Sequence, residues 1–206
     1  MGRRRLTADE RRAALLQAAK ELSMEGGGAT PSLDAIIRRV GGSRRSIYTC
    51  FGGKEGLQTA LIDTVASEIL AALVAREESN LRDTLTCLAR NLLYTLLSPH
   101  GIGLSRIVLQ NSFAAPERAK IFFERGPGKG AELLAQILER ARRRGEIKVA
   151  DSLAAANCFI GMARGNLYLE HVLLREPPGE AEVEAHIRMV VDIFLEGVRA
   201  STADDA

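Results

Sequence analysis

The chain has 206 residues, 46% of them hydrophobic and 26% charged, a composition that permits a sizeable core and disfavours disorder over the whole chain. Tryptophan is absent and aromatic residues make up 4%, whereas leucine, alanine and arginine, which favour helices, are abundant. The net charge of +2 is unevenly spread, with +5 over residues 1–56 and −3 over residues 57–206. We therefore predict an all-α protein with a basic N-terminal domain, residues 1–56, that binds a polyanion, and a second domain, residues 57–206.

Several classes of protein are disfavoured by what the sequence lacks. No apolar run reaches the ~18 residues of a membrane span, and no apolar signal segment follows the N-terminal Met-Gly-Arg-Arg-Arg. The three cysteines and three histidines show neither disulfide nor metal-ligand spacing. We expect a cytoplasmic protein with no metal, no cofactor and no membrane partner.

The first helix is predicted over residues 7–24, because Thr7 and Glu10 have the spacing of a capping box and apolar residues recur at helical intervals from Leu15. Three glycines from Gly26 end it. A short second helix follows Ser32, a good N-cap residue, and ends at Gly41-Gly42.

A third, equally short helix is predicted over residues 44–50, with Ser43 as its cap and Gly52-Gly53 at its end. Ile47 and Phe51, four residues apart, face inward and anchor it. Two short helices joined by a tight glycine turn are the layout of a helix-turn-helix, so the first three helices predict a DNA-binding domain.

A long helix is predicted over residues 54–76, where apolar residues repeat every four positions. Further helices are predicted at 81–98, 103–114, 117–144, 151–174 and 181–200, separated by proline and glycine breakers. The glycine-rich fragment 125–130 is a candidate interruption of the helix over 117–144.

The exposed face of the third helix carries the candidate function. It presents Arg44, Arg45, Ser46, Tyr48 and Thr49. Arginine pairs bidentately with guanine, and hydroxyls reach phosphates. A merely solvated arginine pair is the alternative, but the start of a helix after a tight turn in a basic region favours DNA.

Lys54 adds an independent argument. It lies in the first turn of the long helix, where the helix dipole disfavours a cation. A DNA phosphate bound there would turn that cost into a gain, because free N–H groups also point at it. Local compensation by Glu55 is the alternative.

These residues resemble a known family. The span from about Arg12 to Leu57 is similar to the DNA-binding domain of the TetR/AcrR family of bacterial transcriptional regulators. The matching string is Ser32-Leu33-Asp34-x-Ile36, then Gly41-x-Ser43-x-x-Ser46-Ile47-Tyr48-x-x-Phe51-x-x-Lys54-Glu55-x-Leu57. The C-terminal part resembles the family only loosely, as expected where members bind different ligands.

The resemblance implies a role for each matched position. Arg44, Arg45 and Thr49 would approach bases, and Ser32, Ser46, Tyr48 and Lys54 would approach phosphates. The protein would be a homodimer whose last two helices pair, bound to a near-palindromic double-stranded operator. A small, largely apolar effector would release this repressor by shifting the spacing between the two DNA-binding domains (the heads) of the dimer.

Four positions depart from the family pattern. Gly28 stands where an aromatic residue usually packs, Gly42 replaces a Val or Ile, Ile37 replaces an Ala, and Cys50 replaces a His or Tyr. The two glycines would loosen the head, and Ile37 would partly refill the volume. Cys50 is interpreted as a small packing residue rather than a redox switch.

The helix over 151–174 is apolar almost all round, which predicts burial in a core, at an interface, or both. Small residues on it permit close helix approach, and we expect a dimer seam with the helix over 181–200; ordinary core packing within one chain is the alternative. The candidate seam residues are Ala154, Cys158, Gly161, Gly165, Ile187, Val191 and Phe194.

An effector cavity between helices is expected to have apolar walls with few polar groups. Plain core packing is the alternative here also. The candidate lining residues are Leu96, Ile107, Phe113, Phe122, Phe123, Phe159, Met162 and Asn166.

Two other classes of function fit the sequence less well. An all-α enzyme is disfavoured because the sequence has no HExxH, nucleophile elbow, phosphate-cradling loop or paired-carboxylate motif. A helical protein-interaction module would explain the apolar C-terminal helices but not the basic head.

Overall fold

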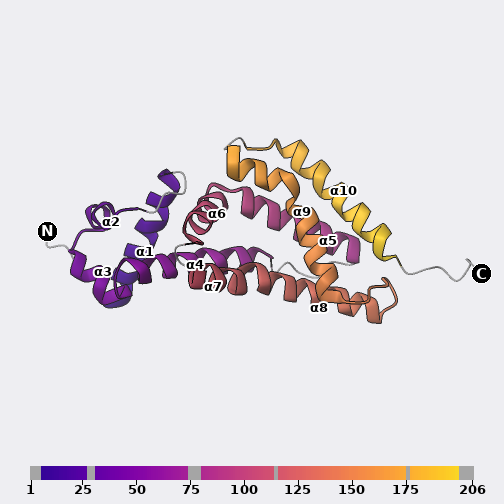
Figure 1. The fold of residues 1–206 in the computed structure, drawn as a ribbon, viewed down its shortest axis with the longest axis horizontal. Helices are drawn as coiled ribbons and strands as arrows, with labels where there is room; N and C mark the ends of the chain where they lie inside the picture. Colours follow the sequence, from indigo (N-terminus) through magenta and orange to yellow (C-terminus); the bar gives the residue numbers. More distant parts are fainter. Residues whose placement is uncertain (1–5, 27–30, 74–79, 114–115, 175–176, 200–206) are drawn as a thin grey trace, which may run out of the picture. The chain divides into compact units, whose positions relative to one another are not determined.

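The computed structural model describes residues 6–26, 31–73, 80–113, 116–174 and 177–199, which form helices and no β-strand (Figure 1). This confirms the all-α prediction. A π-helical turn, η1 (Glu124–Gly128), joins two of the helices. The α-helices are α1 (Ala8–Glu25), α2 (Leu33–Val40), α3 (Arg44–Phe51), α4 (Lys54–Leu73), α5 (Leu81–Leu97), α6 (Pro99–Asn111), α7 (Pro116–Phe123), α8 (Lys129–Arg143), α9 (Ser152–Leu174) and α10 (Glu180–Val198).

Two predicted helices have different limits. The helix expected from residue 103 begins at Pro99, because proline is well accommodated in the first turn, where its missing N–H has no partner to lose. The helix expected over 117–144 is interrupted at the anticipated glycine-rich fragment, where Pro127 lies within η1. No single helix among the described residues is long and apolar enough to cross a membrane, although Leu81–Leu97 and Gly101–Gln110 pass as a bent pair by length and composition.

The chain divides into two compact units. Unit 1 comprises Met1–Ser67 and Pro99–Phe122, and unit 2 comprises Glu68–Ser98 and Phe123–Ala206. This division falls within α4 and places α6 with the N-terminal helices. A domain boundary after residue 56 stays a prediction.

Unit 1 is built on α1, against which α2 and α3 pack (Figure 1). The capping box is confirmed: the Thr7 N–H donates to Glu10 at 2.9 Å, and the Glu10 N–H donates to the Thr7 hydroxyl at 3.2 Å. Ser32 caps α2 by accepting from the Ala35 N–H at 3.2 Å. Ser43 stands at the N-cap position of α3 but its side chain makes no cap hydrogen bond, so that part of the prediction was wrong. The buried core of the unit contains Leu15, Ala18, Ala19, Ile36, Ile47 and Leu57.

The turn between α2 and α3 requires glycine. Gly41 and Gly42 have φ values of 82° and 111°, which side chains with a Cβ rarely adopt. A Cβ on Gly42 would also lie 2.9 Å from Nη1 of Arg11. The family's usual β-branched residue would therefore strain this turn, and Gly42 fits the backbone as it stands. Gly28 lies outside the described residues.

Unit 2 packs α5, α8, α9 and α10 around one apolar cluster. At its centre the rings of Phe159 and Phe194 meet edge to face, with centroids 5.0 Å apart. On the surface, Arg90 of α5 donates to both carboxylate oxygens of Glu184 on α10, at 2.8 Å and 2.6 Å. Hydrogen bonding to Arg90 lowers the pKa of Glu184.

Helix α9 is kinked at Gly165, whose φ of 48° and ψ of −161° are not helical. A kink frees backbone carbonyls from their usual partners one turn along the helix. Here Nε2 of His186 on α10 lies 3.1 Å from the Met162 oxygen and 2.9 Å from the Ala163 oxygen, and it donates to these carbonyls. A Cβ on Gly165 would meet the same imidazole at 3.1 Å. His186 thus hydrogen-bonds the carbonyls beside the kink and fills the space that a side chain at residue 165 would need.

Candidate nucleic-acid interface

Helix α3 is fixed to α1 by its apolar side. Ile47 is fully buried, and Phe51 packs half-buried against the same core. The guanidinium of Arg12 on α1 lies 4.9 Å from the centre of the Phe51 ring, which adds a cation–π contact. As a result the opposite side of α3, with Arg45, Tyr48 and Thr49, is exposed.

Tyr48 has a defined position on this exposed face. Its side chain is 60% exposed, yet its ring lies over the turn that follows α3. A Cβ on Gly53, where φ is 126°, would come within 3.3 Å of the Tyr48 ring. The Tyr48 ring therefore packs closely against the Gly53 backbone, where a side chain at residue 53 would crowd it.

Arg44, the first residue of α3, is not simply a solvated cation. Its Nε donates to Oδ1 of Asp34 at 3.0 Å and its Nη2 donates to Oδ2 at 2.7 Å. Hydrogen bonding to this guanidinium lowers the pKa of Asp34, and the same bonds raise the pKa of Arg44. If Arg44 approaches bases as expected, it does so while its guanidinium is hydrogen-bonded to the Asp34 carboxylate of α2.

The residues predicted to contact phosphates differ in their exposure and hydrogen bonding. The Ser32 hydroxyl accepts a hydrogen bond as the cap of α2 and keeps its own hydrogen for an anion. Ser46 is half-buried beside the glycine turn, whereas Lys54 is exposed at the first position of α4. These residues lie at the N-cap of α2, within α3 and at the start of α4.

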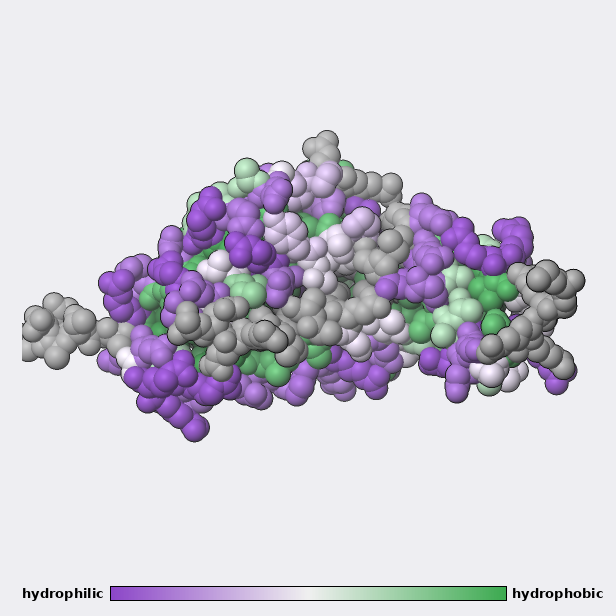
Figure 2. Space-filling model, turned by 180° about the vertical axis from the view of Figure 1, so that it is seen from behind, coloured by the Kyte–Doolittle hydropathy of each residue, from purple (hydrophilic) through white to green (hydrophobic). Residues whose placement is uncertain are grey.

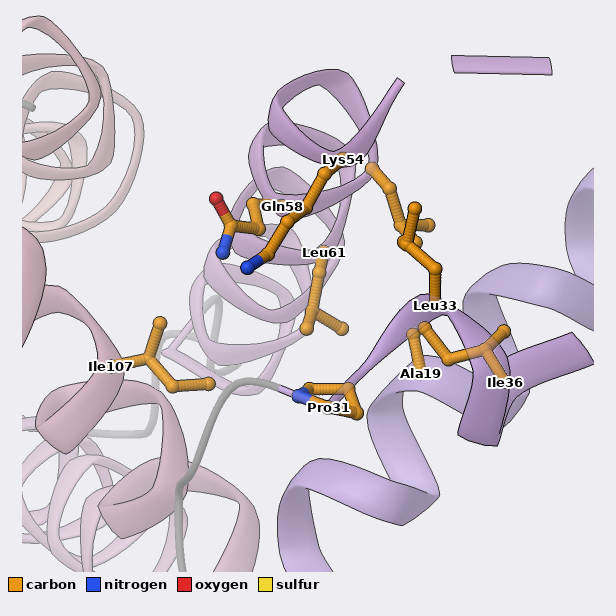
Figure 3. A pocket seen from close by; sticks show the side chains of 9 residues that line it. Ala19, Pro31, Leu33, Ile36, Lys54, Gln58, Leu61 and Ile107 are labelled. Atoms are coloured by element: carbon orange, nitrogen blue, oxygen red, sulfur yellow. The ribbon is translucent and has the colours of Figure 1, made fainter. Parts of the chain in front are cut away.

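A small apolar pocket adjoins Lys54 within unit 1 (Figure 3). Lys54 and Gln58 extend over it from α4, and Ile107 closes it from α6. Of the predicted effector residues only Ile107 lies here. The remaining lining residues are Ala19, Pro31, Leu33, Ile36, Leu57 and Leu61.

The other predicted effector residues are not brought to one cavity. Phe113 and Phe123 are 98% and 60% exposed, so neither lines an enclosed space. Phe159 is core, because its ring is buried against Phe194. Leu96 and Met162 pack half-buried on the core of unit 2, Phe122 is half-buried, and Asn166 is exposed.

The predicted seam residues divide by helix. On α9, Ala154, Cys158, Gly161 and Gly165 are exposed, as the prediction requires. On α10, Ile187, Val191 and Phe194 are buried in the core of their own chain, so the alternative of ordinary core packing holds for them. Helix α10 carries apolar residues beside its buried side as well, and Met189 and Ile193 are the large ones that are exposed, so apolarity alone did not identify the side that faces the core.

Sequence reasoning missed three residues that shape this interface. Asp34 belongs to the string that resembles the family, but nothing in the sequence indicates that it binds Arg44, one short helix and a turn later. Arg12 was not connected with Phe51, because an arginine on a basic helix gives no sign of its partner. Gly56 lies within the predicted helix over 54–76, and the sequence gives no sign that a Cβ there would overlap the Phe51 carbonyl oxygen.

The comparisons with known proteins agree with this geometry. A family model described as bacterial regulatory proteins of the tetR family matches residues 15–61. A second, described as the C-terminal domain of AefR-like transcriptional repressors, matches residues 83–197. No curated protein matches the chain significantly.

Solved structures match over nearly the whole chain. The flavonoid-responsive regulator FrrA is 30% identical, with a TM-score of 0.76, and the match covers 93% of this chain and 98% of FrrA. A TetR transcriptional regulator from Agrobacterium tumefaciens is 25% identical, with a TM-score of 0.78 and coverage of 92% and 94%. A Mesorhizobium loti chain assigned to the TetR family is 22% identical, with a TM-score of 0.85 and coverage of 95% and 100%, a likeness of fold. The chain therefore belongs to the TetR family of bacterial transcriptional regulators, which are DNA-binding transcription factors and not enzymes.

Proposed function

We propose that this regulator is a homodimeric repressor that binds a near-palindromic operator in the cytoplasm and is released by a small, largely apolar effector. The observation that carries the proposal is the exposed side of α3. Arg45, Tyr48 and Thr49 project from a helix whose other side is locked into the core of unit 1 by Ile47. A rigid helix with a basic, hydroxyl-rich face fits the major groove.

The contacts divide into two kinds. Arg44, Arg45 and Thr49 are proposed to approach base edges, which gives sequence selectivity. Ser32, Ser46, Tyr48 and Lys54 are proposed to bind phosphates, which positions the head and makes binding depend on salt. Lys54 gains most from an anion, because it stands exposed at the positive end of the α4 dipole.

Dimerisation is proposed through the outer surfaces of α9 and α10. Apolar residues remain exposed there in the single chain: Leu169, Leu173 and Leu174 on α9, and Met189 and Ile193 on α10. Hydrophilic side chains predominate on the face shown in Figure 2, with apolar ones in patches between them. Exposed apolar residues clustered on adjacent helices are typical of a protein interface. The seam would use Met189 and Ile193 together with the small residues of α9, including Cys158 and Gly161.

The proposals that this regulator represses transcription and that a small molecule releases it are supported by its relatives. The match to the C-terminal domain of AefR-like transcriptional repressors supports repression. FrrA is flavonoid-responsive by name, which supports a small aromatic effector and makes flavonoids the first compounds to screen. Leu96, Met162 and Asn166 remain the candidate contacts in unit 2.

The test is selection of bound sequences from a pool of random duplexes by the full-length protein, followed by affinity measurements over a salt series. The proposal predicts an inverted-repeat motif with half-sites about one helical turn apart or a multiple of it. It also predicts that log Kd rises steeply with log salt concentration. Recovery of no motif, with weak binding equal on all duplexes, would refute it and favour the helical interaction module.

A further inference from the structure

The ion pair between Asp34 and Arg44 occupies one edge of the guanidinium only. Asp34 accepts from Nε and from one hydrogen of Nη2, at 3.0 Å and 2.7 Å. An arginine side chain has five N–H donors in a fixed plane, so both hydrogens of Nη1 and the second hydrogen of Nη2 remain. One hydrogen of Nη1 and the second hydrogen of Nη2 are parallel and form the second bidentate edge of the group. The Arg44 side chain is 67% exposed even with the carboxylate in place.

This pair contributes little to stability, since ion pairs between exposed side chains are worth little in water. Its structural effect is on freedom of motion. Arg44 is the first residue of α3, and Asp34 lies in the first turn of α2, so the pair ties the start of one short helix to the start of the other. A guanidinium held at two atoms has lost most of the rotamer freedom that it would otherwise lose on binding DNA.

We propose that Asp34 is a positioning residue for base recognition: it holds the Nε–Nη2 edge of Arg44 so that the Nη1–Nη2 edge reads one guanine in each half-site. The inference rests on the proposed DNA-binding function and deepens it. Guanine offers N7 and O6 as paired acceptors in the major groove, which match two parallel N–H donors of an arginine. Asp34 touches no base itself and brings a negative charge near the phosphates, so it is expected to weaken overall affinity while sharpening selectivity.

The test compares base-pair discrimination in four proteins: wild type, Asp34→Ala, Arg44→Ala and the double variant. Each is titrated against the selected operator and against every single-base-pair change within one half-site. We expect wild type to disfavour changes at one G·C pair by roughly tenfold or more. We expect Asp34→Ala to bind scrambled duplex more tightly and to lose most of the discrimination at that pair alone. In the double variant the loss should equal that of Arg44→Ala, since the carboxylate acts through the arginine.

The matched control is Glu25→Ala. Glu25, at the end of α1, accepts two hydrogen bonds from Arg39 of α2, at 2.7 Å and 2.9 Å. Removing Glu25 therefore takes away one negative charge and one exposed ion pair, as Asp34→Ala does. It does not contact Arg44, so base discrimination should stay at the wild-type level. Equal discrimination profiles for Asp34→Ala and wild type would overturn the inference, as would equal profiles for Asp34→Ala and Glu25→Ala. A wild-type protein that selects no motif would instead refute the proposed function itself.

Discussion

Replacing Gly56 by alanine tests the packing that sets α3 against α4. Gly56 lies in the first turn of α4, and a Cβ there would overlap the carbonyl oxygen of Phe51 and lie 2.8 Å from its carbon. Both obstructing atoms are backbone, so no side-chain rotation relieves the overlap, and the turn between the helices must move. Overpacking in rigid surroundings costs about 1–3 kcal/mol and occasionally more, and a backbone clash places this substitution at the upper end.

A loss of about 3 kcal/mol corresponds to a fall of roughly 6–12 °C in Tm for a chain of this size. Thermal unfolding followed by circular dichroism measures it. The matched control is Gly197→Ala on α10, where a Cβ would meet nothing within 4 Å, and where alanine should stabilise the helix by up to about 1 kcal/mol. Equal Tm values for Gly56→Ala and wild type would refute the assignment of the tight α3–α4 approach.

Three further predictions follow from other parts of the molecule. Lys54→Ala should weaken binding to all duplexes alike and reduce the slope of log Kd against log salt by about 0.9 per half-site, measured by fluorescence anisotropy; an unchanged slope would exclude a phosphate contact. Ile193→Glu should weaken dimerisation by about a hundredfold or more, because a charge would be buried in the seam, whereas Leu109→Glu, at an equally exposed leucine of α6, should leave the dimer intact in light scattering. The pKa of Glu139 is held well below its usual range, first by Arg142 and then by Arg143 and Ser152, so its stabilising effect is present above the unfolded-state pKa of about 4.3 and declines as the pH falls below that value. Glu139→Gln should therefore lower Tm more at pH 7 than at pH 3, and an equal difference at both pH values would contradict this reading.

Most of unit 1 was predictable because its signals are local. A capping pair such as Thr7 and Glu10, a cap such as Ser32 and the paired glycines after α2 each act within a few residues of their position in the chain. Local signals also indicated which side of α3 is exposed, since Ile47 and Phe51 lie four residues apart on one side of that helix. The structure confirms these expectations.

The parts that sequence reasoning missed depend on contacts between distant residues. The pairing of Arg44 with Asp34 is decided by how α2 and α3 cross, and the two residues lie ten positions apart with no periodic relation. The buried side of α10 was assigned wrongly because Ile187 and Ile193 look alike in sequence, and only packing against α5 and α9 distinguishes them. The aromatic residues expected to line one effector cavity lie in different environments, and the sequence could not show this because apolarity alone does not separate core, cavity and surface.

The central claim is that the exposed face of α3 reads a specific DNA sequence. The measurement is fluorescence anisotropy of the full-length protein with the duplex upstream of its own gene and with a scrambled duplex of equal length, each over a salt series, for wild type and Arg45→Ala. We expect wild type to bind the upstream duplex tightly and selectively, with an affinity that falls steeply as the salt concentration rises. Arg45→Ala should lose selectivity by about 1–3 kcal/mol and keep the same binding to scrambled duplex within a few-fold. If wild type selects an operator and Arg45→Ala discriminates equally well, base recognition by this face of α3 is contradicted.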